Sequence, residues 1–213
     1  MVKIVFFTVL SLVVTSVHSF AGSVIGNVTD QDGKKLEHAL ISLVGDSDIP
    51  ITENVSMPPP EMSQHNIQFS PFVLPVAKGT TVSFPNKDKI RHHVYSFSKV
   101  KRFELELYGG DEEKQVQFDV EGVVALGCNI HDNMLAYIYV AKSNLFATSN
   151  DAGTVSISDL KAGNYKAYVW HPRMSDDEEK LVKDITVTED GTVTVDFQVS
   201  LKRERRRNRR SNY

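Results

Sequence analysis

Short apolar runs separated by turn residues most strongly constrain how this sequence can fold. Between residues 64 and 141, roughly seven such runs occur in about 75 residues, and most alternate apolar with polar side chains, as in 80–84 and 103–108. Gly, Pro, Asn and Asp separate the runs, and no segment shows the repeat of an amphipathic helix. This spacing is typical of an all-β Greek-key sandwich.

A second set of strands is expected at the two ends of the chain. Residues 22–48 contain two apolar runs around a turn at 30–33, and residues 142–200 contain several more. About 27 residues cannot bury a core alone. We therefore expect 22–48 plus 142–200 to form one discontinuous β-sandwich that flanks the inserted unit 64–141. Three consecutive modules are the alternative, and the Pro-rich segment 49–63 is the expected linker.

The N-terminal segment is typical of a signal peptide, 1–19. Lys3 supplies a positive charge, residues 4–17 are almost entirely apolar, and small residues precede cleavage after Ser19 or Ala21. The apolar run is short for a membrane span. We expect an exported protein, periplasmic in a bacterium, and an uncleaved membrane anchor is the alternative.

Charge is distributed unevenly along the chain. The net charge is −3, but the C-terminal segment 201–213 contains seven basic residues and one Glu, so the remainder is acidic. We expect this segment to be a disordered tail that can contact an anionic surface. An exported protein is not expected to bind nucleic acid.

One short loop carries three soft or borderline metal ligands. Cys128 is the single cysteine, and His131 and Met134 follow it at intervals of three residues. A lone thiol in an exported chain cannot form an internal disulfide, which favours a metal role. Thiolate, imidazole and a weak thioether are the ligands of blue-copper sites. The pair His92–His93 is the upstream candidate for a second imidazole, and only one of the two is expected to bind, because adjacent strand residues face opposite sides.

Other interpretations of these residues remain open. Cys128 could be a small core residue, part of a zinc site with two His, or a nucleophile beside His131, although zinc has no use for a Met. Met62 and His65 are further candidate soft ligands. No G-x-S-x-G, H-E-x-x-H or phosphate-loop motif is present, so we expect neither an enzyme nor a small-molecule substrate.

The inserted unit resembles the cupredoxin (blue copper) family, of the amicyanin or plastocyanin type. The resemblance rests on C-x-x-H-x-x-M, on Gly122 six residues before the Cys, and on G-T-x-V-x-F-x-N-x-D-x-x-x-H-x-V over 79–94. It implies one type 1 copper ion whose ligands are His92, Cys128, His131 and Met134. In this family an Asn follows the first His ligand, and here His93 occupies that place.

The flanking strands carry a second resemblance. The run G-x-V-x-D-x-x-G-x-x-L-x-x-A at 26–39 resembles transthyretin-like (carboxypeptidase regulatory-like) sandwiches. The combination with a cupredoxin unit is similar to periplasmic proteins of the methylamine-utilisation type. Together the resemblances imply an exported carrier of single electrons that meets redox partners transiently, with electrons passing at the His131 edge. Copper storage, delivery or sensing is one alternative, and a non-redox assembly or adhesion module is another.

Overall fold

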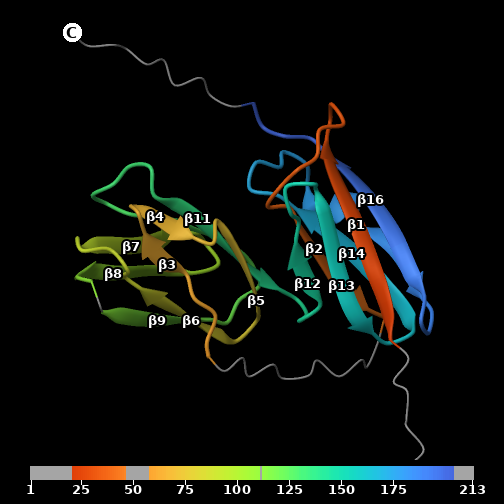
Figure 1. Ribbon diagram of the computed structural model, residues 1–213, viewed down its shortest axis with the longest axis horizontal. Coiled ribbons are helices and arrows are strands. Elements are labelled where there is room, and N and C mark those ends of the chain that lie inside the picture. Colours follow the sequence, from red (N-terminus) through yellow and green to blue (C-terminus); the bar gives the residue numbers. More distant parts are fainter. Residues whose placement is uncertain (1–20, 47–57, 111, 204–213) are drawn as a thin grey trace, which may run out of the picture.

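The expectation of an all-β protein is confirmed. The structure, a computed structural model, describes residues 21–46, 58–110 and 112–203 (Figure 1). These residues form β-strands and one 3-10 turn, Glu178–Leu181, with no α-helix among them. Within the same residues, no helix is long and apolar enough to cross a membrane. The expected signal peptide, and most of the expected linker and tail, fall outside the described residues.

Strands from both ends of the sequence share two sheets, which we call the outer unit. β1 lies between β13, its antiparallel partner, and β16, its parallel partner, and the other sheet has the order β12-β2-β14-β15. Alternate β1 residues such as Val24 and Val28 are buried in the core between the sheets. The strands are β1 (Gly22–Asp30), β2 (Leu40–Gly45), β12 (Phe146–Thr148), β13 (Thr154–Leu160), β14 (Gly163–Trp170), β15 (Lys183–Val187) and β16 (Thr192–Val199).

The strands between them form the inner unit. Its largest sheet has the order β5-β11-β10-β7-β8, and β6 pairs with β9 on the other side of a separate apolar core. Pro75 lies on β5 at the sheet edge, where a missing N–H is tolerated. The strands are β3 (Ser63–His65), β4 (Gln68–Ser70), β5 (Val73–Ala77), β6 (Thr80–Pro85), β7 (His92–Phe97), β8 (Arg102–Tyr108), β9 (Glu113–Phe118), β10 (Gly122–Gly127) and β11 (Leu135–Ala141).

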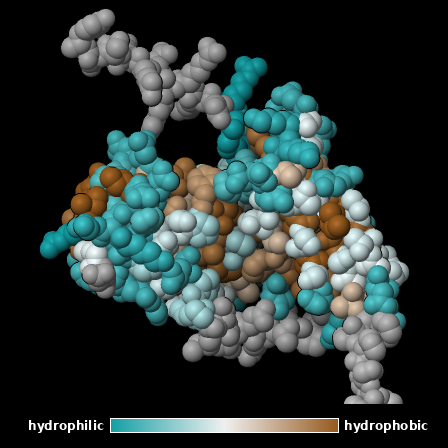
Figure 2. All heavy atoms as spheres, in the orientation of Figure 1, coloured by the Kyte–Doolittle hydropathy of each residue, from teal (hydrophilic) through white to brown (hydrophobic). Residues whose placement is uncertain are grey.

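An aromatic contact joins the two units. Trp170 of β14 lies against Tyr137 and Tyr139 of β11, with ring centroids 5.7 and 5.5 Å apart. The Tyr139 hydroxyl donates a hydrogen bond to the Glu178 carboxylate. Figure 2 shows hydrophobic atoms gathered along this boundary. In sequence, the strands of the inner unit therefore lie between β2 and β12 of the outer unit, while the boundaries 22–48, 64–141 and 142–200 stay predictions.

Candidate metal centre

The loop between β10 and β11 holds three of the four predicted ligands. Cys128 directly follows the last residue of β10, and Met134 directly precedes the first residue of β11. Gly127 and Leu135 pair across the base of the loop, and the Met134 N–H donates to the His131 carbonyl oxygen at 3.0 Å. The hairpin therefore fixes the spacing of the ligands, since paired strands hold both ends of the loop.

A β-bulge on β8 lies opposite His93, because Val94 pairs with Leu105 whereas His92 pairs with Tyr108. The register between β7 and β8 shifts between His92 and Val94, and both His92 and His93 are buried. The His93 Nε2 lies 2.7 Å from the exposed Glu104 carboxylate. His92 turns instead toward His131, with ring centroids 5.0 Å apart. The structure thus brings His92, and not His93, to the ligand loop.

Three potential ligand atoms converge at this end of the inner sheet. One donor atom from each of His92, Cys128 and His131 lies within 4.8 Å of the other two. The Cys128 Sγ is 3.7 Å from the His131 Nδ1. The buried Nδ1 atoms of His92 and His93 both have no hydrogen-bond partner among the described residues. An unpaired buried nitrogen is costly, and of these two histidines His92 is the one in the cluster with the thiol and the second imidazole, so its free Nδ1 fits a bound metal ion.

Asp88 fixes the orientation of the His92 ring. Its Oδ2 lies 2.8 Å from the His92 Nε2, and the carboxylate also accepts the N–H groups of Asn66 and Ile67. Burial opposes ionisation, but these donors and the His92 ring hold the pKa of the Asp88 carboxyl below its ordinary value. A carboxylate at Nε2 favours the tautomer that leaves Nδ1 free to bind a metal.

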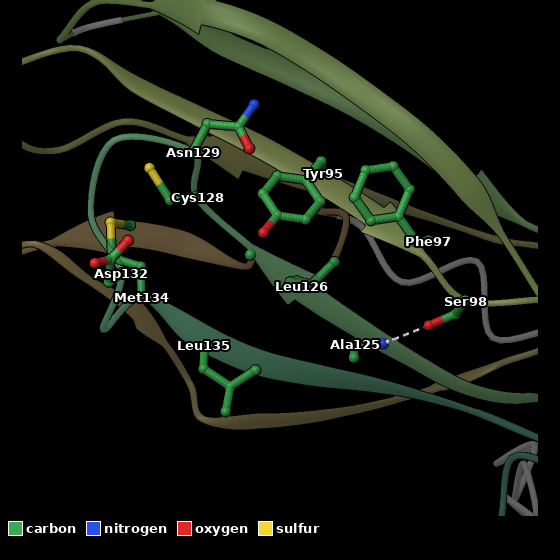
Figure 3. A pocket seen from close by; sticks show the side chains of 11 residues that line it. Tyr95, Phe97, Ser98, Ala125, Leu126, Cys128, Asn129, Asp132, Met134 and Leu135 are labelled. Carbon is green, nitrogen blue, oxygen red and sulfur yellow. Dashed lines mark hydrogen bonds between the residues drawn. The ribbon is translucent and has the colours of Figure 1, made fainter. Parts of the chain in front are cut away.

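Met134 is the fourth predicted ligand, and it lies beside Cys128. Both side chains are buried, and both line an open pocket of about 600 Å³ on the side of Tyr95 and Phe97 (Figure 3). His131 is partly exposed at the rim of the site. The site therefore has a buried thiol and thioether and one imidazole that reaches toward solvent.

Two minor candidate ligands lie outside the cluster, and two residues near the site were not predicted from the sequence. Met62 is part of the inner apolar core, and His65 is an exposed side chain 3.9 Å from the Asp88 carboxylate. Asp88 was not singled out, although it lies four residues before His92 within the motif at 79–94. Tyr95 was not predicted either, because its position next to Gly127 depends on the register between β7 and β10.

Comparisons with known proteins give partial structural similarity. No protein-family model matches this chain, and no curated protein matches it. A copper-containing nitrite reductase from Thermus scotoductus SA-01 is 26% identical, over 39% of this chain and 22% of its own, with a TM-score of 0.38. This chain therefore spans less than a quarter of that enzyme.

Two small copper proteins are also similar in part. A purple cupredoxin from Nitrosopumilus maritimus is 20% identical over 38% of this chain and 99% of its own, with a TM-score of 0.36. The reduced Cu(I) form of an amicyanin variant is 18% identical over 47% of this chain and 98% of its own, with a TM-score of 0.37. Each likeness covers less than half of this chain, so its function is inferred from its own residues.

Proposed function

We propose that this protein is exported, binds one type 1 copper ion and carries single electrons between redox partners. His92, Cys128 and His131 would bind the ion strongly, and Met134 would bind it weakly. The observation that carries the proposal is the convergence of ligand atoms from two imidazoles and one thiol, one of those imidazoles, His92, having an unpartnered Nδ1. This donor set suits both copper oxidation states, and the bound ion would supply a reversible one-electron couple.

The residues around the site favour electron transfer over copper delivery. A protein that hands its metal to an acceptor needs accessible ligands, whereas His92, Cys128 and Met134 are all at least 95% buried. Paired strands hold the loop at both ends, and Asp88 holds the His92 ring. A site held in this way changes little when an electron arrives or leaves. We therefore place storage and delivery second, and we expect no catalysed reaction.

A visible spectrum and a redox titration test the proposal. The copper-loaded protein is expected to show an intense blue or purple charge-transfer band and a reversible one-electron couple. Cys128→Ser is expected to abolish the band, while Met134→Leu keeps it with a changed potential. A colourless protein that binds only Cu(I) would favour storage or delivery, and a protein that takes up no copper would favour an assembly module.

The two histidines supply a matched pair of variants. His92→Asn is expected to remove the band, because it deletes the nitrogen beside Cys128. His93→Asn is expected to keep it, because His93 contacts Glu104 outside the ligand cluster. The reverse result would assign the ligand to His93.

A further inference from the structure

The first and last strands of the described chain end at the same end of the outer unit. β1 and β16 run parallel, and Asp30, the last residue of β1, pairs with Val199, the last residue of β16. Figure 1 shows the turn after β1 and the chain after β16 side by side at this end. The basic C-terminal segment therefore begins beside Lys34 and Lys35, which follow the turn.

Hydrogen bonds hold the start of the C-terminal segment against the folded unit. The Leu201 N–H donates to the Gln31 Oε1 at 2.9 Å. The Lys202 N–H donates to the Arg173 carbonyl oxygen at 2.8 Å, and the Arg173 guanidinium donates to the Lys202 carbonyl oxygen at 3.2 Å. Lys202 and Arg203 are exposed, so the basic segment leaves the unit from a fixed point.

Charge at this end is opposite in sign to the charge of the rest of the protein. The chain from 204 to 213 contains five Arg and one Glu. With the residues that line the hollow where it begins, it carries a formal charge of +5, so the remainder of the chain, whose total is −3, carries −8. We call the basic members of this set, with the arginines at 205–210, the basic end. The charged residues of the hollow are Lys34, Lys35, Arg173, Lys202, Arg203, Asp30, Asp32, Glu37 and Asp151.

The carboxylates of the hollow leave its lysines available. Asp30 is 7% exposed, and its Oδ1 accepts the N–H groups of Asp32 and Lys34, so this carboxylate closes the turn. Lys34, Lys35 and Lys202 are exposed, and none of them forms an ion pair with another described residue. The folded part of the basic end therefore adds cations next to those of the C-terminal segment.

We propose that the basic end binds the phosphate headgroups of an anionic phospholipid bilayer. Clusters of four to eight Lys and Arg bind such surfaces by charge. A fitted protein partner would need an apolar centre, whereas Leu36 is buried and Leu201 partly buried at this end. A bilayer presents many phosphates in no fixed geometry, which suits a set of cations without apolar contact. The inference goes beyond the proposed function and does not depend on copper.

Vesicle binding tests the inference. The chain from residue 20, which keeps every described residue, is mixed with vesicles of phosphatidylcholine, either alone or with one quarter phosphatidylglycerol, and bound protein is measured by flotation. Binding to the anionic vesicles is expected to be at least twentyfold tighter than to the neutral ones. It is expected to be equal with and without copper, and to be largely lost in about 0.5 M salt, because salt screens charge interactions. Failure of the copper site would leave this result unchanged.

Single substitutions test the folded part of the basic end. A Lys or Arg near an anionic membrane strengthens binding roughly fivefold. Lys34→Gln and Lys35→Gln are therefore each expected to weaken vesicle binding about threefold to fivefold. Lys161→Gln is the matched control, because exposed Lys161 follows Leu160, which pairs with Gly22 at the other end of β1. The nine residues of β1 span roughly 26 Å, more than twice the range of exposed charges at about 0.1 M salt, so this change is expected to matter less than about 1.5-fold.

Three outcomes would overturn the inference. One is that the protein binds neither kind of vesicle, or binds both equally. Another is that Lys34→Gln and Lys35→Gln bind as Lys161→Gln does, which would leave the contact to the C-terminal segment alone. The third is tighter binding to soluble polyglutamate than to anionic vesicles at equal charge, which would indicate an acidic protein partner. Thermal melting checks that each variant folds, and Lys34→Arg is expected to bind as wild type does.

Discussion

Replacing Asp88 with Asn isolates what one carboxylate does for the metal centre. Its two oxygens accept three hydrogen bonds, at 2.8 Å from the Asn66 N–H, 3.0 Å from the Ile67 N–H and 2.8 Å from the His92 Nε2. An amide has one accepting oxygen, so at least one donor loses its partner in either orientation. When the amide nitrogen faces His92, the ring must accept at Nε2 and carry its proton on Nδ1, where the metal would bind.

The magnitude follows from those contacts. Hydrogen bonds to a charged group contribute about 1.5–3 kcal/mol, against about 0.5–1.5 kcal/mol for neutral ones. Two of the donors lie near solvent, so we expect the free energy of unfolding of the metal-free protein to fall by about 2 kcal/mol. Losing a carboxylate partner of a metal-binding His typically costs 10–100-fold in metal affinity. We expect Cu(I) affinity to fall within about that range.

Two assays separate these effects. Urea denaturation of the metal-free protein reports stability, and competition with bicinchoninate reports Cu(I) affinity. Asp119→Asn is the control, because the Asp119 carboxylate is exposed in the loop that follows β9. This substitution is expected to lower the free energy of unfolding by less than about 0.5 kcal/mol. If Asp88→Asn lowers stability but binds Cu(I) within twofold of wild type, Asp88 serves only to hold the turn at Asn66 and Ile67.

Three further predictions concern the outer unit and its joint. Tyr139→Phe removes the hydroxyl that donates to Glu178 and is expected to cost about 1–2 kcal/mol in urea denaturation; wild-type stability would show that the bond contributes nothing. Burial lowers the pKa of His171 to about 4, below its unfolded value of 6.5, so the stability it contributes is complete above about pH 6.5 and is lost as pH falls toward 4. Melting curves between pH 7 and 4 should show a shallower decline for His171→Asn, and an unchanged slope would contradict this. Gly153→Ala, where φ is +69° and a Cβ would lie 2.7 Å from a backbone oxygen, is expected to cost about 1–3 kcal/mol, and more than Gly33→Ala, where φ is +80° and no atom lies within 4 Å; equal losses would mean that the close contact relaxes.

Much of the fold could be predicted because burial imposes a two-residue period on each strand. The predicted strands at 80–84 and 103–108 correspond to β6 and β8, and each observed strand is one residue longer. We expected the two neighbouring histidines to face opposite sides of the strand, with only one turned to the site. His92 is the one in the ligand cluster, but both side chains are buried. The β-bulge adds one residue to β8, between Leu105 and Tyr108, and nothing in the sequence of β7 marks where it occurs.

Ligands that lie close together in the sequence were easier to predict than the one that lies far away. Cys128, His131 and Met134 share one loop, so their spacing alone placed them together. His92 is far upstream, and its approach depends on the pairing of Tyr95 with Gly127. The cover provided by Trp170 could not be anticipated, because it depends on how two units meet. Leu135, Tyr137 and Tyr139 are alternate residues of one strand, and this row of large side chains indicated that the face they share is partly covered.

The pairing of β1 with β16 also bears on the order in which the protein can be built. β1 and β16 are the first and last strands of the described chain, and Ser23 meets Thr192 across a separation of 169 residues. Every strand of the inner unit is synthesised between them, so that unit can fold while one edge of β1 still lacks its partner. An unpaired strand edge invites association with other chains. The interval between making β1 and β16 is therefore the period in which a newly made chain is most exposed to aggregation.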